Sequence, residues 1–270
     1  MTDFNNMRIF GPTPQYSRVL KYKPDYDLPK PLIIAGPCQI ESEAIIIAKY
    51  LKNIGIEYMR GGVFSAGTYP SDNFGLRFKD LEMWYCIAKE IGLKIVVEVF
   101  DPRHIGPISE YADIVQIGAR ACQNYALLKE VSKLDKIVTL KRGPGMTLDE
   151  LLGACEYLLM GKARPILVER GGASHLNHTR WELSCSLIAA VKNICNIPIL
   201  VDASHGSGRR DLVEPLTLAG IAAGADGCII ECHYDPDNAK GADYIQTIGL
   251  NEMGILNNKI HNIYREINNA

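Results

Sequence analysis

Short apolar runs alternate along this chain with longer stretches that have helical spacing. The apolar runs predict strands, and apolar residues three or four positions apart predict helices between them. Strands are expected at 32–35, 57–60, 94–99, 114–117, 137–140, 165–168, 198–201 and 227–230. Helices are expected near 42–54, 75–91, 103–111, 123–133, 147–160, 181–194 and 210–223, with a final one near 250–267. Eight strands that alternate with helices indicate a parallel α/β fold.

Two parallel architectures fit this alternation, a closed (β/α)8 TIM barrel and a doubly wound open sheet. In an open sheet the functional groups gather at one crevice, whereas nearly every strand of a barrel contributes. Polar or glycine residues follow all eight predicted strands, which favours the barrel. The 270 residues also suit a barrel, which typically has about 250 residues. We therefore expect an N-terminal arm or hairpin at residues 1–30, where prolines interrupt the chain, and one catalytic barrel domain at 31–270.

Composition narrows the class of protein. Lys and Arg (29) nearly balance Asp and Glu (31), so no overall basic charge favours nucleic acid. No apolar run approaches the roughly 20 residues that span a bilayer, and no signal peptide is recognisable. The eight cysteines lack a Cys-x-x-Cys pair and lie mostly in apolar runs, as reduced buried thiols do. These features predict a soluble cytoplasmic protein.

One set of polar residues at the strand ends has the chemistry of a metal site. Cys38, His205 and Glu231, with Asp235 or Asp243, supply a thiolate, an imidazole and carboxylates. Such a set can hold Mn, Fe, Co or Zn. The alternative is that Cys38 is a buried thiol and His205 an ordinary hydrogen-bonded histidine, and the residue types alone leave both interpretations open.

A second set consists of four cations, Arg60, Arg120, Lys141 and Arg170, each at the end of a different predicted strand. A single Arg is usually solvated or paired with a carboxylate, but four on one rim indicate a site for a multiply charged anion. Arg supplies a fork of donors and Lys a point charge. Within a barrel, this pattern favours a phosphorylated carboxylic acid over an internal salt-bridge network.

Several motifs in matching order resemble those of the 3-deoxy-D-arabino-heptulosonate 7-phosphate (DAHP) synthases. The resemblance is to their short type I beta branch, which is related to 3-deoxy-octulosonate 8-phosphate synthases. The motifs span residues 31–250 and are Gly36-Pro37-Cys38-x-x-Glu41-Ser42, Arg60-Gly61-Gly62, Gln116-Ile117-Gly118-Ala119-Arg120, Lys141-Arg142-Gly143, Glu169-Arg170-Gly171, Asp202-x-Ser204-His205-Gly206-x-Gly208-Arg209-Arg210-Asp211 and Ile230-Glu231-x-His233.

The resemblance implies a (β/α)8 barrel, usually a homodimer or homotetramer, that condenses phosphoenolpyruvate with erythrose 4-phosphate and releases phosphate in aromatic biosynthesis. The implied ligands of its divalent metal are Cys38, His205, Glu231 and Asp243, with Asp235 as the fallback for the last. The implied catalytic residues are Lys141, His205 and Cys38. The implied substrate-binding residues are Arg60, Thr68, Ala119, Arg120, Lys141 and Arg170.

Two departures from the family pattern affect the acceptor side. After Arg60-Gly61-Gly62 the family usually reads Lys-Pro-Arg-Thr-Ser-Pro, whereas this chain has Ser65-Ala66-Gly67-Thr68-Tyr69-Pro70. The usual Ile-Arg pair after Glu169-Arg170-Gly171 is replaced by Gly172-Ala173. Three interpretations follow: a DAHP synthase with a remodelled acceptor loop, a synthase that uses phosphoenolpyruvate with another aldehyde or sugar phosphate, and a non-catalytic barrel that binds phosphoenolpyruvate. Retention of all the expected metal-ligand types argues against the third.

Overall fold

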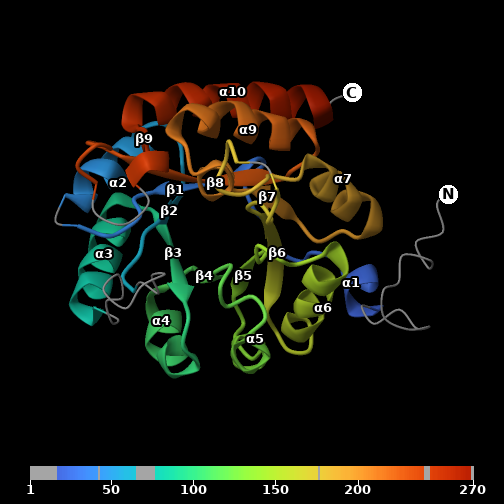
Figure 1. Ribbon diagram of the computed structural model, residues 1–270. Helices are drawn as coiled ribbons and strands as arrows, with labels where there is room; N and C mark the ends of the chain where they lie inside the picture. The colour runs from blue at the N-terminus through green and yellow to red at the C-terminus, as the bar shows by residue number, and fades with distance from the viewer. Residues whose placement is uncertain (1–16, 42, 65–76, 176, 240–243, 269–270) are drawn as a thin grey trace.

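The computed structural model describes residues 17–41, 43–64, 77–175, 177–239 and 244–268. Eight parallel strands form its centre (Figure 1). They are β1 (Leu32–Gly36), β2 (Tyr58–Arg60), β3 (Lys94–Val99), β4 (Ile114–Ile117), β5 (Ile137–Lys141), β6 (Arg164–Glu169), β7 (Ile199–Val201) and β8 (Gly227–His233). Each strand pairs with the next, and β1 also pairs with β8, where Leu32 lies opposite Gly227. The sheet is therefore closed, and the predicted (β/α)8 TIM barrel is confirmed.

Helices follow the strands and surround the barrel (Figure 1). They are α2 (Ala44–Asn53), α3 (Phe78–Ile91), α4 (Ile105–Tyr111), α5 (Tyr125–Ser132), α6 (Leu148–Leu158), α7 (Cys185–Ile194) and α9 (Arg210–Ala222). The chain ends in a short strand, β9 (Ile248–Gly249), which pairs with β8, and in α10 (Leu250–Asn268). None of the helices in the described ranges combines the length and apolar character needed to cross a membrane.

Alternation along each strand creates two separate cores. In β1, Leu32 and Ile34 belong to the cluster inside the barrel, whereas Ile33 and Ala35 belong to the larger cluster between strands and helices. Both sets are buried because parallel strands are covered on both faces. The inner cluster also contains Tyr58, Val96, Ile114, Ile166, Val168, Leu200 and Ile229. These apolar layers fill the barrel below the polar residues at its carboxyl end.

The N-terminal region is described from Ser17 onward. A short helix, α1 (Ser17–Lys21), packs against α6, where Glu156 Oε1 accepts a hydrogen bond of 2.8 Å from the backbone N–H of Val19. The first sixteen residues of the expected 1–30 arm lie outside the described residues. The boundary between arm and barrel therefore stays a prediction.

One short helix was not expected from the sequence. Residues 203–207 form α8 (Ala203–Ser207) directly after β7, and the Asp202 side chain accepts a hydrogen bond of 3.0 Å from the backbone N–H of His205 at its start. Five residues are too few to show helical periodicity, whereas the capping aspartate is typical of a helix start. The helix ends at Gly208, whose φ of 63° is left-handed.

Candidate active site

The polar residues of the candidate site continue the inward-facing positions of the strands. Tyr58 and Ile229 lie in the inner core, so Arg60 and Glu231, two positions further along the same strands, face the same interior. Ile137 packs against that core, and Lys141 lies four positions on. Since active-site residues of barrels lie at the carboxyl ends of the strands, this polar layer marks the functional end of the molecule.

Glu231 is fully buried and has three partners. Arg60 donates to its Oε1 from Nη1, Gln246 donates to its Oε2 from Nε2 at 2.6 Å, and its backbone N–H donates to Ser204 Oγ at 3.0 Å. Burial alone would lower the pKa of the Arg60 guanidinium, but the Glu231 charge and then Cys38 raise it above its usual value. The Arg60 guanidinium is therefore held in place against Glu231.

Asp202 is also fully buried, and it joins two other residues of the site. It accepts hydrogen bonds from Lys141 Nζ at 2.7 Å and from His205 Nδ1 at 2.9 Å. Burial alone would raise the pKa of this carboxyl, but His205 and Lys141 together hold it well below its usual value. With Nδ1 engaged by Asp202, the other ring nitrogen of His205 lies 3.5 Å from Glu231 Oε1. Arg60, Glu231, His205, Asp202 and Lys141 thus form one continuous network.

Cys38 lies beside this network in the segment that follows β1. The backbone N–H of Gly62 donates a hydrogen bond of 2.9 Å to the Cys38 carbonyl, and Gln39 and Gly62 form a parallel bridge. The thiol side chain belongs to a half-buried residue, close enough to Arg60 to affect the pKa of its guanidinium. The structure therefore brings Cys38 near Arg60 and Glu231.

A small pocket of about 60 Å³ opens at the carboxyl end of β3 to β7. It is lined by Glu98, Phe100, Gly118, Ala119, Arg120, Lys141, Arg170 and His205. Three of the four predicted cations and the predicted Ala119 thus surround one space, whereas Arg60 pairs with Glu231 and is not part of this lining. Arg170 is buried, and its guanidinium lies 5.6 Å from the centre of the Trp181 ring. Its orientation is thereby supported by a cation–π contact.

Arg142 and Glu169 hold the loop that carries Arg170. Arg142 Nη2 donates to Glu169 Oε1 at 2.8 Å, and the same oxygen accepts from the backbone N–H groups of Gly171 at 3.1 Å and Ser184 at 3.0 Å. Gly172 leaves room for this arrangement, because a Cβ there would lie 2.5 Å from Arg142 Nη1. The guanidinium therefore occupies the space that a larger residue at position 172 would need.

The structure describes only some of the metal ligands and substrate-binding residues proposed from the sequence. Thr68 and Asp243 lie outside the described residues, so both stay predictions. Asp235, the fallback ligand, accepts a hydrogen bond of 2.9 Å from Asn238 Nδ2. Within the described ranges, no three His, Cys, Asp or Glu residues are arranged to hold a metal ion. The donor set fits a metal in one respect: hydrogen bonding of His205 Nδ1 to a carboxylate is typical of metal-binding histidines.

Four residues of the site were given no catalytic, substrate-binding or metal-binding role from the sequence: Glu98, Gln116, Asp202 and Gln246. Gln116 Nε2 donates to Glu98 Oε2 at 2.8 Å, and a Cβ at Gly118 would lie 2.2 Å from Glu98 Oε1, so Gly118 makes room for that carboxylate. Counting two positions on from the inward residues Val96, Ile114 and Leu200 finds the first three. Gln246 follows β8 by a loop, and no periodicity locates it.

Comparison with known proteins decides the family. Residues 27–265 match the family described as the DAHP synthetase I family. The chain belongs to this family. The chain is 40% identical over 210 residues to a phospho-2-dehydro-3-deoxyheptonate aldolase from Thermotoga maritima, covering 77% of this chain and 62% of that protein. It is 30% identical over 251 residues to a 2-dehydro-3-deoxyphosphooctonate aldolase from Desulfotalea psychrophila, covering 85% of this chain and 88% of that protein.

Two solved structures of DAHP synthases are similar to this chain. A crystal structure of the Thermotoga maritima DAHP synthase matches with a TM-score of 0.82 and 37% identity, over 87% of this chain and 69% of that one. A truncated form of 3-deoxy-D-arabino-heptulosonate 7-phosphate synthase from the same organism matches with a TM-score of 0.79 and 35% identity, over 87% of each chain. The chain thus spans less than two thirds of the curated Thermotoga relative and most of the truncated form.

Proposed function

We propose that this protein condenses phosphoenolpyruvate with erythrose 4-phosphate to give DAHP and phosphate. The observation that carries the proposal is the convergence of Arg120, Lys141 and Arg170 on one pocket beside His205. Membership of the DAHP synthetase I family supports it, because the names of its relatives describe aldolases of seven- and eight-carbon keto-sugar phosphates.

The negative charges of phosphoenolpyruvate match the cations of this pocket. Arg120 and Arg170 would bind the phosphate of phosphoenolpyruvate through charge-assisted hydrogen bonds, with Lys141 between them and the carboxylate. Arg60 would meet that carboxylate near Lys141. Both Lys141 and Arg60 are held by buried carboxylates, Asp202 and Glu231, so they are oriented before substrate arrives. Such preorganisation reduces the entropy lost when the substrate binds.

A divalent metal would be held by Cys38, His205, Glu231 and a further carboxylate, Asp243 or Asp235. The thiolate, imidazole and carboxylate set accommodates Mn, Fe, Co or Zn. When bound, such a metal supplies Lewis-acid polarisation of the aldehyde carbonyl. The contact of 2.9 Å between Asp202 Oδ1 and His205 Nδ1 orients the imidazole so that Nε2 lies 3.5 Å from Glu231 Oε1.

In the proposed reaction, C3 of phosphoenolpyruvate forms a bond to the aldehyde carbon, and the aldehyde oxygen takes up a proton. Water adds its hydroxyl to C2. The bond between C2 and the phosphate oxygen then breaks, the C2 hydroxyl becomes the ketone carbonyl, and its proton leaves with the phosphate. One water is consumed, supplying the hydroxyl at C2 and the proton. Lys141, Arg120 and Arg170 hold the phosphoryl group through this sequence and neutralise its charge as it departs.

A second acceptor, another aldehyde or sugar phosphate, is favoured by one observation. Gly172 stands where the family usually has a larger residue, and Arg142 fills the space against it. The Arg that usually follows at position 173 is Ala173 here, so one cation of the acceptor side is absent. A lost charge-assisted hydrogen bond to a phosphate costs about 1.5–3 kcal/mol, so affinity for erythrose 4-phosphate is where the two proposals differ.

Phosphate release tests these proposals. The purified protein with Mn²⁺, phosphoenolpyruvate and a panel of aldoses and aldose phosphates should release phosphate with erythrose 4-phosphate. Release of phosphate only with a different aldehyde would show that this aldehyde, and not erythrose 4-phosphate, is the acceptor. No release with any aldehyde would support the non-catalytic barrel. Gly67→Arg, at a position outside the described residues, should raise affinity for the acceptor phosphate. The expected homodimer or homotetramer is tested by light scattering of the same preparation.

A further inference from the structure

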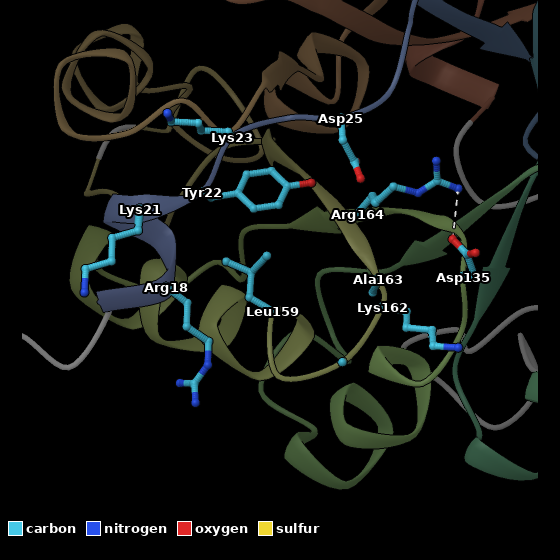
Figure 2. A pocket seen from close by; sticks show the side chains of 11 residues that line it. Arg18, Lys21, Tyr22, Lys23, Asp25, Asp135, Leu159, Lys162, Ala163 and Arg164 are labelled. Atoms are coloured by element: carbon cyan, nitrogen blue, oxygen red, sulfur yellow. Dashed lines mark ion pairs between the residues drawn. The ribbon is translucent and has the colours of Figure 1, made fainter.

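A second pocket lies at the opposite end of the barrel from the candidate active site. Strand β6 connects the two: Arg170 follows its carboxyl end, whereas Arg164 begins the strand and lines this second pocket (Figure 2). Its volume is about 690 Å³. Pockets for small molecules usually measure about 300–1,000 Å³, so the space suits a metabolite rather than a single ion.

The two walls of this pocket come from segments far apart in the sequence. One wall is the arm at α1 and just after it, with Arg18, Lys21, Tyr22, Lys23 and Asp25; the other is formed by loops before β5 and β6 (Figure 2). The α1 wall is anchored to α6, because Glu156 accepts from the Val19 N–H at 2.8 Å and pairs with Arg18 at 3.2 Å. The arm thus forms a fixed side of the pocket.

The opposite wall is equally well held. Ser132 O accepts backbone hydrogen bonds from Lys162 at 2.7 Å and Ala163 at 3.1 Å, and the Arg164 N–H donates to Lys136 O at 2.9 Å. Both walls therefore exist before any ligand arrives, and a ligand would bind without ordering the backbone around it.

The charge of the lining is strongly one-sided. The lining contains five cations and two carboxylates, Asp25 and Asp135, although the whole chain has a net charge of −2. Arg164 pairs with Asp135 at 3.4 Å. No carboxylate in the described ranges pairs with Lys21, Lys23 or Lys162. Tyr22 adds a ring and a neutral hydroxyl, since burial and then the Asp25 charge raise the pKa of that hydroxyl to about 12.

We infer that this pocket is a second ligand site, which binds a phosphorylated small molecule carrying two or more negative charges. The lysines supply point charges and Arg164 a fork of donors for phosphate oxygens. Tyr22 and Leu159 offer apolar surface to the carbon skeleton. The two carboxylates, Asp25 and Asp135, disfavour a long polyanion such as nucleic acid.

Isothermal titration calorimetry tests the inference on the full chain, with fructose 1,6-bisphosphate as the probe and saturating phosphoenolpyruvate to occupy the active site. The bisphosphate should still bind, more weakly as salt rises, whereas fructose should not. Lys23→Glu and Lys162→Glu should each weaken binding by about tenfold or more, because each replaces an attractive charge with a repulsive one. Lys49→Glu is the matched control, since Lys49 is exposed on α2 across the barrel from α6 (Figure 1). The affinity of this variant for the bisphosphate should stay within about twofold of that of the unaltered protein.

Amide hydrogen exchange supplies a second measurement on the unaltered protein. Bound bisphosphate should slow exchange in 17–25 and 159–164, and leave α2 unchanged. Absence of binding up to about 10 mM, displacement by phosphoenolpyruvate, or equal binding by the Lys23→Glu and Lys162→Glu variants would each overturn the inference. Because the active site is occupied throughout, these outcomes do not depend on which acceptor the enzyme uses.

Discussion

Lys141 donates a hydrogen bond from Nζ to Asp202 Oδ2 at 2.7 Å, and both side chains are buried. The contact ties the carboxyl end of β5 to that of β7 inside the barrel. Because the other oxygen of Asp202 accepts from His205, this one carboxylate sets the position of a proposed phosphate-binding lysine and of a proposed metal ligand. Asp202 is therefore expected to affect both halves of the site.

Asp202→Asn should weaken metal binding and phosphoenolpyruvate binding together. The amide removes the charge that compensates Lys141, and loss of one partner of a buried ion pair costs about 3–5 kcal/mol of stability. Loss of such a support for a metal-binding histidine typically weakens metal affinity about 10- to 100-fold. Urea unfolding measures the loss of stability, and metal titration measures the loss of metal affinity.

The control for this substitution is Glu130→Gln, which removes the surface pair that Glu130 of α5 makes with Lys133, just after the helix. Exposed pairs contribute about 0–1 kcal/mol, so its stability and metal affinity should resemble those of the unaltered protein. Unchanged metal affinity in Asp202→Asn would contradict a positioning role for this carboxylate.

Gly118→Ala should disrupt the pocket through Glu98. A Cβ at position 118 would lie 2.2 Å from Glu98 Oε1, so the carboxylate must leave its place beside Gln116. The displaced atoms are the end of a flexible side chain, so the cost in stability should lie below the roughly 1–3 kcal/mol typical of an overpacked core. We expect little change in stability and a higher KM for phosphoenolpyruvate, measured by thermal unfolding and phosphate release.

Gly153→Ala is the matched control for Gly118→Ala. Gly153 lies within α6, and nothing comes within 4 Å of a Cβ built there. Alanine is favoured over glycine in a helix by about 0.8–1 kcal/mol, so this variant should be slightly more stable and equally active. A similar KM in both glycine variants would show that the position of the Glu98 carboxylate does not affect binding of phosphoenolpyruvate.

Cys38→Ser tests the proposed thiolate ligand. Serine keeps the size of the side chain but does not ionise at neutral pH, so metal affinity and activity should fall together, by about 10-fold or more. Metal titration and phosphate release measure the pair. Cys86→Ser, on the exposed face of α3, should change neither. Full activity with unchanged metal affinity in Cys38→Ser would remove this residue from the ligand set.

The sequence predicted the barrel well because each strand carries its own local signal. The expected strand at 137–140 and the observed β5 differ by one residue, and the polar residues expected at the strand ends lie together at one end of the barrel. The network inside that face was not predictable in the same way. Asp202 and Lys141 are 61 positions apart, and Glu231 and Arg60 are 171 apart. Such pairings depend on closure of the barrel, which no local pattern describes.

The stability of the barrel should fall at alkaline pH, and Cys232 should contribute to this fall. Burial raises the pKa of the Cys232 thiol to about 12, although Arg60 acts to lower it. An unfolded thiol has a pKa of about 8.5, so the native state binds more protons between these values. The stabilising contribution is fully present below the unfolded pKa and is lost as pH rises toward the folded one. For one group the slope is at most about 1.4 kcal/mol per pH unit.

Urea unfolding at pH 8, 9 and 10 checks this prediction. Cys232→Ala removes the titrating group, so its free energy of unfolding should fall less steeply with pH than that of the unaltered protein. Cys86→Ala, at an exposed position, should retain the original slope. The variant's lower stability at pH 8 does not affect the comparison, because the slope with pH is what Cys232 alters. Parallel slopes in all three proteins would contradict a neutral buried thiol at position 232.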